Sequence, residues 1–420
     1  MDKKLFEVEI SNNGPRGYES AAVLEMPATW AEFHDALQKA RIKDARHCEN
    51  ELTCIHFHGV TNAMIGQNVN LYDLNLFAQR LEALNEDQKI GLEALLRMEQ
   101  DQHAGPIPLE RLINLTYNTD ICLLAPQAST PQELGEFLYG NGMLSDEAAS
   151  LLDTLEKNSR FRAKLLELLG EQHQEEHCGV FTRNGYAELG GEIQPIHEHR
   201  PGETLYFHRS GAPVVLEVRK GFFSDPSYDN DKTAILNLPA SDADIWQAVG
   251  EVDAASPDEC VFRCIDCRIP SLREAINDAI EDGGGLEGVN RFAQQLAKDL
   301  RIWDLNDLVK YKALLSAAGQ PSLQDAMELM HGLDEYDLRP EVTETWDYAE
   351  LVLREKYPDL PEELFQTPQA ARLGQKWFEQ SNAALTDYGL LRRKDGGPLP
   401  SFQREQERSE SPAWGGIEMT

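Results

Sequence analysis

The feature that most constrains this chain of 420 residues is an internal repeat. Residues 21–37 (AAVLEMPATWAEFHDAL) align with residues 233–249 (TAILNLPASDADIWQAV) at an offset of 212. Further matches follow in the same order, with offsets that drift by a few residues: Leu74–Leu81 with Val289–Leu296, Ala94–Leu96 with Ala313–Leu315, and Thr182 and Gly185 with Thr386 and Gly389. A unit of roughly 190 residues is too long for a solenoid repeat and has the size of a whole domain.

The repeat and the composition along the chain predict four segments. We expect two related units at residues 1–192 and 213–395. Residues 193–212 are rich in Gly and Pro and contain His197-Glu198-His199, which predicts a linker between the units. Residues 396–420 are polar and rich in Gly, Pro and Ser, which predicts a disordered tail.

The hydrophobic pattern of each half predicts an α+β fold, a small antiparallel sheet followed by a helical middle. Strands are expected at 6–10, 21–26 and 52–57, and a helix at 30–40 begins after Thr29. Further helices are expected at 71–84, 87–98, 108–117 and 131–139, and a closing hairpin at 180–189 turns at Asn184-Gly185. The second half predicts the same order, with one helix over 342–356.

The net charge of −33 is shared by both halves. Residues 1–200 contain 32 acidic and 17 basic residues, a net charge of −15, and residues 201–420 contain 40 and 22, a net charge of −18. Binding of nucleic-acid phosphates requires cations, so this excess argues against direct binding of nucleic acid. Acidity alone is explained at least as well by solubility.

The distribution of the charge is more informative. Residues 112–156 contain no Lys or Arg, and residues 328–350 contain eight acidic residues against one basic residue, Arg339. Solvated helix faces usually mix the two signs, because opposite charges four residues apart stabilise a helix. We infer that something outside the fold uses these stretches.

Acidic residues also recur at aligned positions of the two units. Glu341, Glu344, Asp347 and Glu350 are spaced by three, which predicts one flank of a helix. Glu32 and Asp244 are explained equally well by the preference of helix N-termini for acids. The candidate partner-binding surface comprises Glu32, Glu133, Glu136, Asp146, Glu147, Asp244, Glu341, Glu344, Asp347, Glu350, Glu362 and Glu363.

One motif suggests metal chemistry. His173, Glu176 and His177 match H-x-x-E-H, the pattern of an inverted zincin, in which two histidines hold zinc and the glutamate acts as a base. The segment is polar, lacks a long apolar helical pattern and has no counterpart in the second unit. We expect no catalytic residue, no metal and no cofactor, and a zinc hydrolase stays a lesser alternative.

Three other motifs are better explained by structure. Cys264-x-x-Cys267 lacks a second ligand pair for zinc, and its position in an expected strand favours buried thiols. His56 and His58 lack an obvious third ligand. The Gly283–Gly285 run is surrounded by acids that would repel phosphate, which predicts a loop.

Each unit resembles the antirestriction protein ArdA family. The resemblance begins at FEVEISNNGPRGYESAAVLEMPATWAEFHDAL and continues through ELTCIHFH and the helical middle LYDLNLFAQRLEALNEDQKIGLEALL. A helix beginning at T-P-Q-E-L and the closing GVFTRNGYAEL are also similar. The resemblance covers residues 5–192 and, more weakly, residues 213–392.

The resemblance implies an acidic, elongated, non-enzymatic mimic of DNA, carried by a mobile genetic element. Members of that family dimerise and place surface carboxylates in the DNA groove of type I restriction–modification enzymes. Duplex DNA carries one charge per roughly 1.7 Å of axis, so a rigid acidic scaffold can compete for the same cationic groove. In this chain the duplication would allow a homodimer or a pseudo-dimer within one chain.

The sequence therefore predicts an inhibitor of a DNA-binding host defence enzyme, with a DNA-binding protein as partner and with no membrane partner. An acidic adaptor that binds another protein of a mobile element remains an alternative. The seven scattered cysteines suit a reducing compartment, and residues 1–10 lack the apolar region of a signal peptide. We accordingly expect a cytoplasmic protein.

Overall fold

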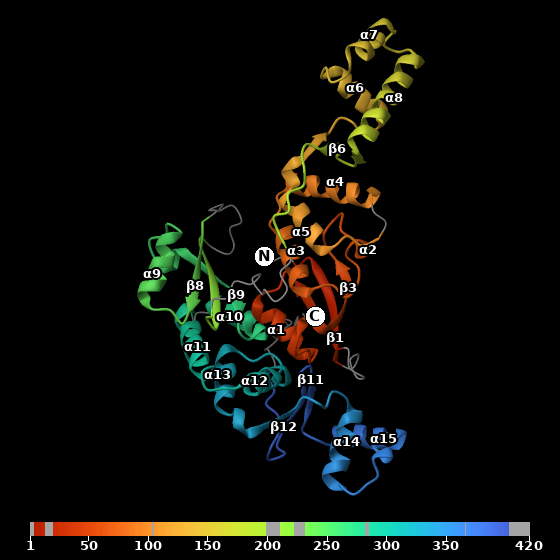
Figure 1. Cartoon of the computed structure of the whole chain (residues 1–420). Coiled ribbons are helices and arrows are strands. Elements are labelled where there is room, and N and C mark those ends of the chain that lie inside the picture. The colour runs from red at the N-terminus through yellow and green to blue at the C-terminus, as the bar shows by residue number, and fades with distance from the viewer. Residues whose placement is uncertain are drawn as a thin grey trace, which may run out of the picture. The chain divides into compact units, whose positions relative to one another are not determined.

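The structure is a computed structural model that describes residues 4–12, 20–102, 105–198, 211–221, 232–281, 285–365 and 367–402. The chain divides into two compact units, Met1–His208 and Arg209–Thr420. Each unit is α+β and contains two three-stranded antiparallel sheets among its described residues (Figure 1). The α+β fold class predicted from the sequence is confirmed.

The first unit begins and ends with strands and has helices between them. Its strands are β1 Phe6–Asn12, β2 Ala22–Met26, β3 Cys48–Ile55, β4 Cys122–Ala125, β5 Val180–Thr182 and β6 Gly185–Leu189. Its α-helices are α1 Trp30–Lys39, α2 Asn62–Ile65, α3 Leu71–Glu82, α4 Glu86–Gln102, α5 Leu109–Tyr117, α6 Pro131–Gly140, α7 Asp146–Thr154 and α8 Arg160–His177. Short 3-10 turns precede β3 and β4.

The N-terminal sheet has the order β2-β1-β3, and buried side chains alternate with more exposed ones along residues 6–10 of β1. Phe6, Val8 and Ile10 of β1 point into the core and are fully buried, while the glutamates between them point away. The inner face of this sheet packs with α1, α3, α4 and α5 in one apolar core. The second sheet, β4-β6-β5, joins the same core through Val180 and Ala187.

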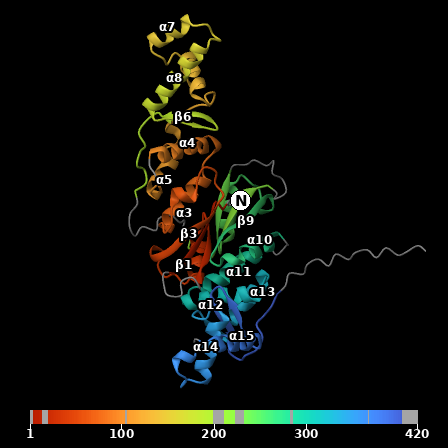
Figure 2. The same ribbon diagram turned by 90° about the vertical axis from the view of Figure 1, so that its right-hand side faces the viewer.

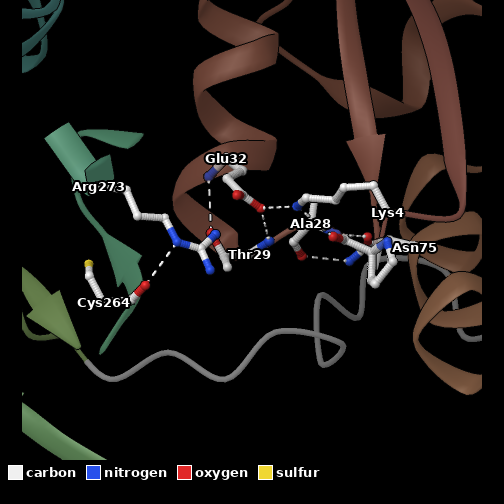
Figure 3. Close-up of polar contacts among 8 residues, drawn as sticks. Lys4, Ala28, Thr29, Glu32, Asn75, Cys264 and Arg273 are labelled. Carbon is white, nitrogen blue, oxygen red and sulfur yellow. Dashed lines mark hydrogen bonds and ion pairs between the residues drawn. The ribbon is translucent and has the colours of Figure 1, made fainter. Parts of the chain in front are cut away.

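Helix α1 begins where the sequence predicts. The Thr29 hydroxyl accepts a hydrogen bond from Glu32 N, and the Glu32 carboxylate accepts one from Thr29 N at 2.9 Å, which completes a capping box (Figure 3). The side chain of Asn75 on α3 then fixes the chain before α1. It donates to Ala28 O at 3.1 Å and accepts from Ala28 N at 2.7 Å.

Helices α6, α7 and α8 form a separate part of the first unit, beyond β6 and away from β1 and β3 (Figures 1 and 2). Helix α6 crosses α8 at two glycines. A Cβ on Gly135 would lie 2.0 Å from Leu166 O, and one on Gly170 would lie 1.9 Å from Pro131 O, so only glycine permits this contact. A small apolar cluster that includes Leu134, Leu138 and Tyr186 joins α6 to β6.

The second unit follows a similar order of elements. Its strands are β7 Val214–Lys220, β8 Thr233–Leu238, β9 Cys260–Cys267, β10 Tyr336–Arg339, β11 Ala384–Thr386 and β12 Gly389–Arg393. Its α-helices are α9 Asp242–Glu251, α10 Arg273–Glu281, α11 Gly285–Asp299, α12 Leu305–Ala318, α13 Leu323–His331, α14 Thr345–Lys356 and α15 Pro368–Glu379. Short 3-10 turns lie at Pro257–Glu259, Pro270–Leu272, Leu333–Glu335 and Glu362–Leu364.

Several details of the second unit repeat those of the first. The sheet orders β8-β7-β9 and β10-β12-β11 correspond to β2-β1-β3 and β4-β6-β5. Asn290 on α11 accepts from Ala240 N at 2.9 Å and donates to Ala240 O at 2.8 Å, as Asn75 does with Ala28. Gly185 and Gly389 both adopt positive φ in the closing hairpin. These details are what a duplication would produce, and the duplication itself stays a prediction that superposition of the two units would test.

The structure differs from the expected boundaries in two places. Residues 194–197 of the expected linker are hydrogen bonded to Asn114 and Asn118 of the first unit. His199 and the rest of that segment up to residue 210 lie outside the described residues. In the expected tail, Phe402 N donates to Ala318 O at 2.7 Å, so described structure continues past residue 395; residues 403–420 are outside the described residues.

One helix was not predicted, and one predicted helix begins later than expected. The H-x-x-E-H segment lies at the end of the 18-residue helix α8, although the sequence shows no long apolar pattern there. The helix expected over 342–356 begins instead at Thr345, because the Asp347 carboxylate binds the N–H groups of Thr343 and Glu344 and holds them outside the helix.

Candidate functional site

The acidic residues of α6, α7 and the turn after α7 form one exposed group. We call Glu133, Glu136, Asp146, Glu147, Asp153 and Glu156 the α6–α7 acidic surface. All six are exposed, and none forms an ion pair with a cation of the described residues. Asp120, the remaining acid of the stretch without Lys or Arg, is also exposed but lies before β4.

The partners of these carboxylates are neutral groups. Glu133 accepts a hydrogen bond from Ser129 N at 2.8 Å, and Glu136 accepts one from the Gln132 side chain at 3.1 Å. The Tyr139 hydroxyl donates to Asp153. Neutral donors orient a carboxylate without cancelling its charge, so the full negative charge of the surface faces solvent.

Two basic residues near the start of α8, Arg162 and Lys164, contact groups other than the six carboxylates. Arg162 donates to Leu152 O, and its guanidinium lies over the Tyr139 ring, 4.8 Å from the centroid. Lys164 pairs with Glu167 at 3.0 Å. Local contacts therefore occupy both of these cations.

Helix caps hold the six carboxylates on defined turns. Thr130 caps α6, with Pro131 at its first position, and Ser145 caps α7. Glu133, Asp146 and Glu147 lie in the first turns of these helices, where the positive end of the helix dipole stabilises negative charge. The glycine crossing of α6 with α8 makes this a fixed scaffold for the charges.

Asp347 and Glu350 of the second unit align with Glu133 and Glu136 of the first, but their surroundings differ. Asp347 is buried, and it accepts hydrogen bonds from Thr343 N and Thr343 Oγ1, both at 2.9 Å. Glu350 pairs with Arg354 at 2.9 Å. These two side chains are occupied by the fold and present little free charge.

The expected flank of four acids on one helix is therefore not formed. Glu341 precedes α14, Glu344 is its N-cap, and only Asp347 and Glu350 lie within the helix. Two neighbouring acids of the same stretch are also paired, Glu335 with Arg393 and Asp337 with Arg392. The capping role of Asp347 and the i,i+4 spacing of Glu350 and Arg354 are signals that the sequence does contain.

The remaining predicted residues are mostly helix caps. Glu32 caps α1 and pairs with Lys4 at 2.7 Å (Figure 3). Asp244 completes a capping box with Ser241, and hydrogen bonds from Ser241 hold the pKa of this exposed carboxyl below its usual value. Glu363 is exposed in the 3-10 turn after α14; the side chain of Glu362 lies outside the described residues.

The thiols of Cys264 and Cys267 are buried, as the sequence predicts. Burial raises the pKa of Cys267 to about 12 and also raises that of Cys264, so both stay protonated near neutral pH. The backbone carbonyl of Cys264 accepts from Arg273 at 2.9 Å (Figure 3). In the sheet of the first unit, the residue at the register position of Cys264 is Leu52 of β3.

The two histidines of the H-x-x-E-H motif do lie together. His173 and His177 are one turn apart on α8, with parallel rings whose centroids are 4.1 Å apart. The carboxylate beside them belongs to Glu188 of β6, whereas Glu176 is exposed and accepts from Gln172. The sequence pattern gave no signal for Glu188, because it comes from a different element.

All seven cysteines are free thiols. Among the described residues, no helix combines the length and apolar character needed to cross a bilayer. Comparison of the chain with models of known protein families and with curated proteins finds no match.

Proposed function

We propose that this protein is a non-enzymatic inhibitor that imitates DNA, and that the α6–α7 acidic surface occupies the DNA groove of a host defence enzyme. One observation carries the proposal: six exposed carboxylates, none ion-paired with a described cation, lie on two capped helices and the turn after the second, within residues 133–156. An ordinary solvated surface would gain stability by mixing signs. A surface that forgoes this gain is suited to a cationic partner.

The resemblance to ArdA proteins makes a type I restriction–modification enzyme the first target to test. Such an enzyme binds duplex DNA through cations, and a rigid array of carboxylates can compete for the same cations. The buried and paired acids of α14 assign the larger share of binding to the first unit. We propose that it acts in the cytoplasm, which the free thiols and the nature of the target support.

A competition experiment tests the proposal. A fluorescently labelled DNA duplex is bound to a purified type I restriction–modification enzyme, and the protein is added at increasing concentration. Inhibition by mimicry predicts that the anisotropy of the DNA falls to its free value. Binding to the enzyme without release of DNA, or no binding, would contradict mimicry, and the former would favour the adaptor alternative.

A further inference from the structure

The C-terminal end of α8 and the strand β6 carry a cluster that the proposed function does not use. His173 Nε2 lies 2.8 Å from Glu188 Oε2, and His177 Nδ1 lies 4.0 Å from the same oxygen. One ligand atom from each of these three residues can be chosen so that all lie within 4.8 Å of one another. His173 and Glu188 are largely buried, with side chains 16% and 12% exposed, whereas His177 is 47% exposed.

The surrounding residues hold Glu188 in place. The Tyr186 hydroxyl donates to Glu188 Oε2 at 3.0 Å. Gly179 makes room for the ring, since a Cβ there would lie 2.1 Å from the Tyr186 hydroxyl oxygen. Cys178, at φ 50°, ends α8 and turns the chain toward β5. A second contact thus orients the carboxylate, as outer partners do at metal sites.

We propose that His173, His177 and Glu188 bind one Zn²⁺ ion that fastens the C-terminal end of α8 to β6. Two imidazoles and one carboxylate are a donor set that zinc accepts, with a fourth position left for water. Zinc–ligand distances of about 2.0–2.2 Å place tetrahedral donors roughly 3.3–3.6 Å apart. The distances of 2.8 and 4.0 Å from the two imidazoles to Glu188 Oε2 bracket this range, and all three donors lie within 4.8 Å of one another, so side-chain movements without a change of fold bring them to zinc distance. The exposed edge at His177 provides access.

The inference departs from the sequence-based expectation that the chain holds no metal, and it is independent of the proposed function. The ion would have a structural role, because it would fix the position of α8, and α6 packs on Gly170 of the same helix. In the second unit, the offset of 204 that relates Gly185 to Gly389 relates Glu188 to Arg392. Arg392 on β12 pairs there with Glu355 of α14 at 3.0 Å. At the position of Glu188 the second unit therefore has a cation that pairs with a helix, and not a carboxylate that could bind a metal.

Titration of the full chain with Zn²⁺ in a calorimeter tests the proposal, with Co²⁺ absorption as a probe of geometry. We expect one equivalent of Zn²⁺ to bind, the thermal midpoint to rise, and Co²⁺ to give the visible bands of a low-coordinate nitrogen and oxygen site. Glu188→Gln and His177→Ala should each weaken Zn²⁺ binding by at least about 100-fold, more than the loss of an outer partner causes. His177→Ala changes a half-exposed side chain, so it keeps the test valid if Glu188→Gln disturbs the fold.

Two control variants separate this site from the alternatives. Glu176→Gln removes the glutamate of the H-x-x-E-H motif and should leave Zn²⁺ affinity unchanged, whereas the inverted-zincin alternative predicts lost hydrolysis. Cys54→Ser removes one of three potential ligands, Glu7, Cys54 and His56, that converge on the first sheet, and should also leave the affinity unchanged. No binding to the wild-type chain, or binding that survives His177→Ala and Glu188→Gln, would overturn the proposal. Binding abolished by Cys54→Ser would overturn it as well.

Discussion

Glu133 and Asp347 are each the third residue of a helix, and each accepts a hydrogen bond from the backbone N–H four residues earlier. Glu133 is exposed on α6, whereas Asp347 is buried on α14. The same local hydrogen-bond arrangement therefore has a different consequence in each unit. In the first unit it leaves a charge facing solvent, and in the second it satisfies a buried helix start.

The first prediction follows from this difference. Asp347→Ala removes the acceptor of three hydrogen bonds from a buried site, and we expect it to lower the free energy of unfolding by about 1–3 kcal/mol. Glu133→Ala changes an exposed residue and should cost clearly less. Urea denaturation followed by circular dichroism measures both variants. Equal destabilisation by the two substitutions would show that Asp347 has no special structural role.

The second prediction concerns the acidic surface. Replacing Glu133, Glu136, Asp146 and Glu147 together by Gln or Asn should weaken binding to a type I restriction–modification enzyme markedly and leave the fold intact. Each carboxylate contributes part of a summed field, so single replacements should cost little. Competition with labelled duplex DNA measures the loss of binding.

A matched control removes the same charge from elsewhere. Asp242, Glu251, Asp258 and Glu287 are exposed in the second unit. Replacing these four in the same way changes the net charge equally. If both fourfold variants bind equally weakly, net charge rather than the α6–α7 acidic surface governs the interaction.

The third prediction concerns the glycine crossing under that surface. Gly170→Ala would bring a Cβ within 1.9 Å of Pro131 O, which forces α6 and α8 apart. We expect a loss of about 1–3 kcal/mol in the free energy of unfolding, as for other overpacked contacts. Gly140→Ala is the control, because no heavy atom lies within 4 Å of a Cβ at that position. Thermal unfolding that ranks Gly140→Ala as the more harmful change would refute the crossing.

The fourth prediction concerns the asparagines that bind the chain before α1 and α9. Asn75→Ala leaves the buried N–H and C=O of Ala28 without their partner, and we expect a cost of about 2–4 kcal/mol. Asn290→Ala should also destabilise, but less, because Asn290 is only half-buried. Chemical denaturation measures both against Asn141→Ala, an exposed site. No effect from Asn75→Ala would mean that water replaces the side chain.

The sequence predicts most strands and helices because their signals are local. Alternation along β1 and the cap at Thr29 are visible without a structure. Helix α8 was missed because Gly170, one of its main contacts with α6, has no side chain for periodicity to detect. Glu188 was missed because it reaches His173 from another element.

The charged residues likewise include some whose free or paired state could be predicted from the sequence and some whose state could not. The exposure of the α6–α7 acidic surface could be inferred because no Lys or Arg lies within that stretch. The pairing of Glu335 could not, because its partner Arg393 is 58 residues away and comes close to it only through the pairing of β10 with β12. Local composition therefore predicts an unpaired charge reliably only where the fold does not bring close to it a cation from a distant part of the sequence.

The most direct test of DNA mimicry is the salt dependence of binding to a type I restriction–modification enzyme. Calorimetric titration of the wild-type chain at about 50 and 200 mM salt should show an affinity that falls by at least about tenfold, because salt ions compete for the cationic groove. The variant lacking charge at Glu133, Glu136, Asp146 and Glu147 should bind weakly at both concentrations and show a smaller dependence on salt. An affinity that changes neither with salt nor with this fourfold neutralisation would contradict the account.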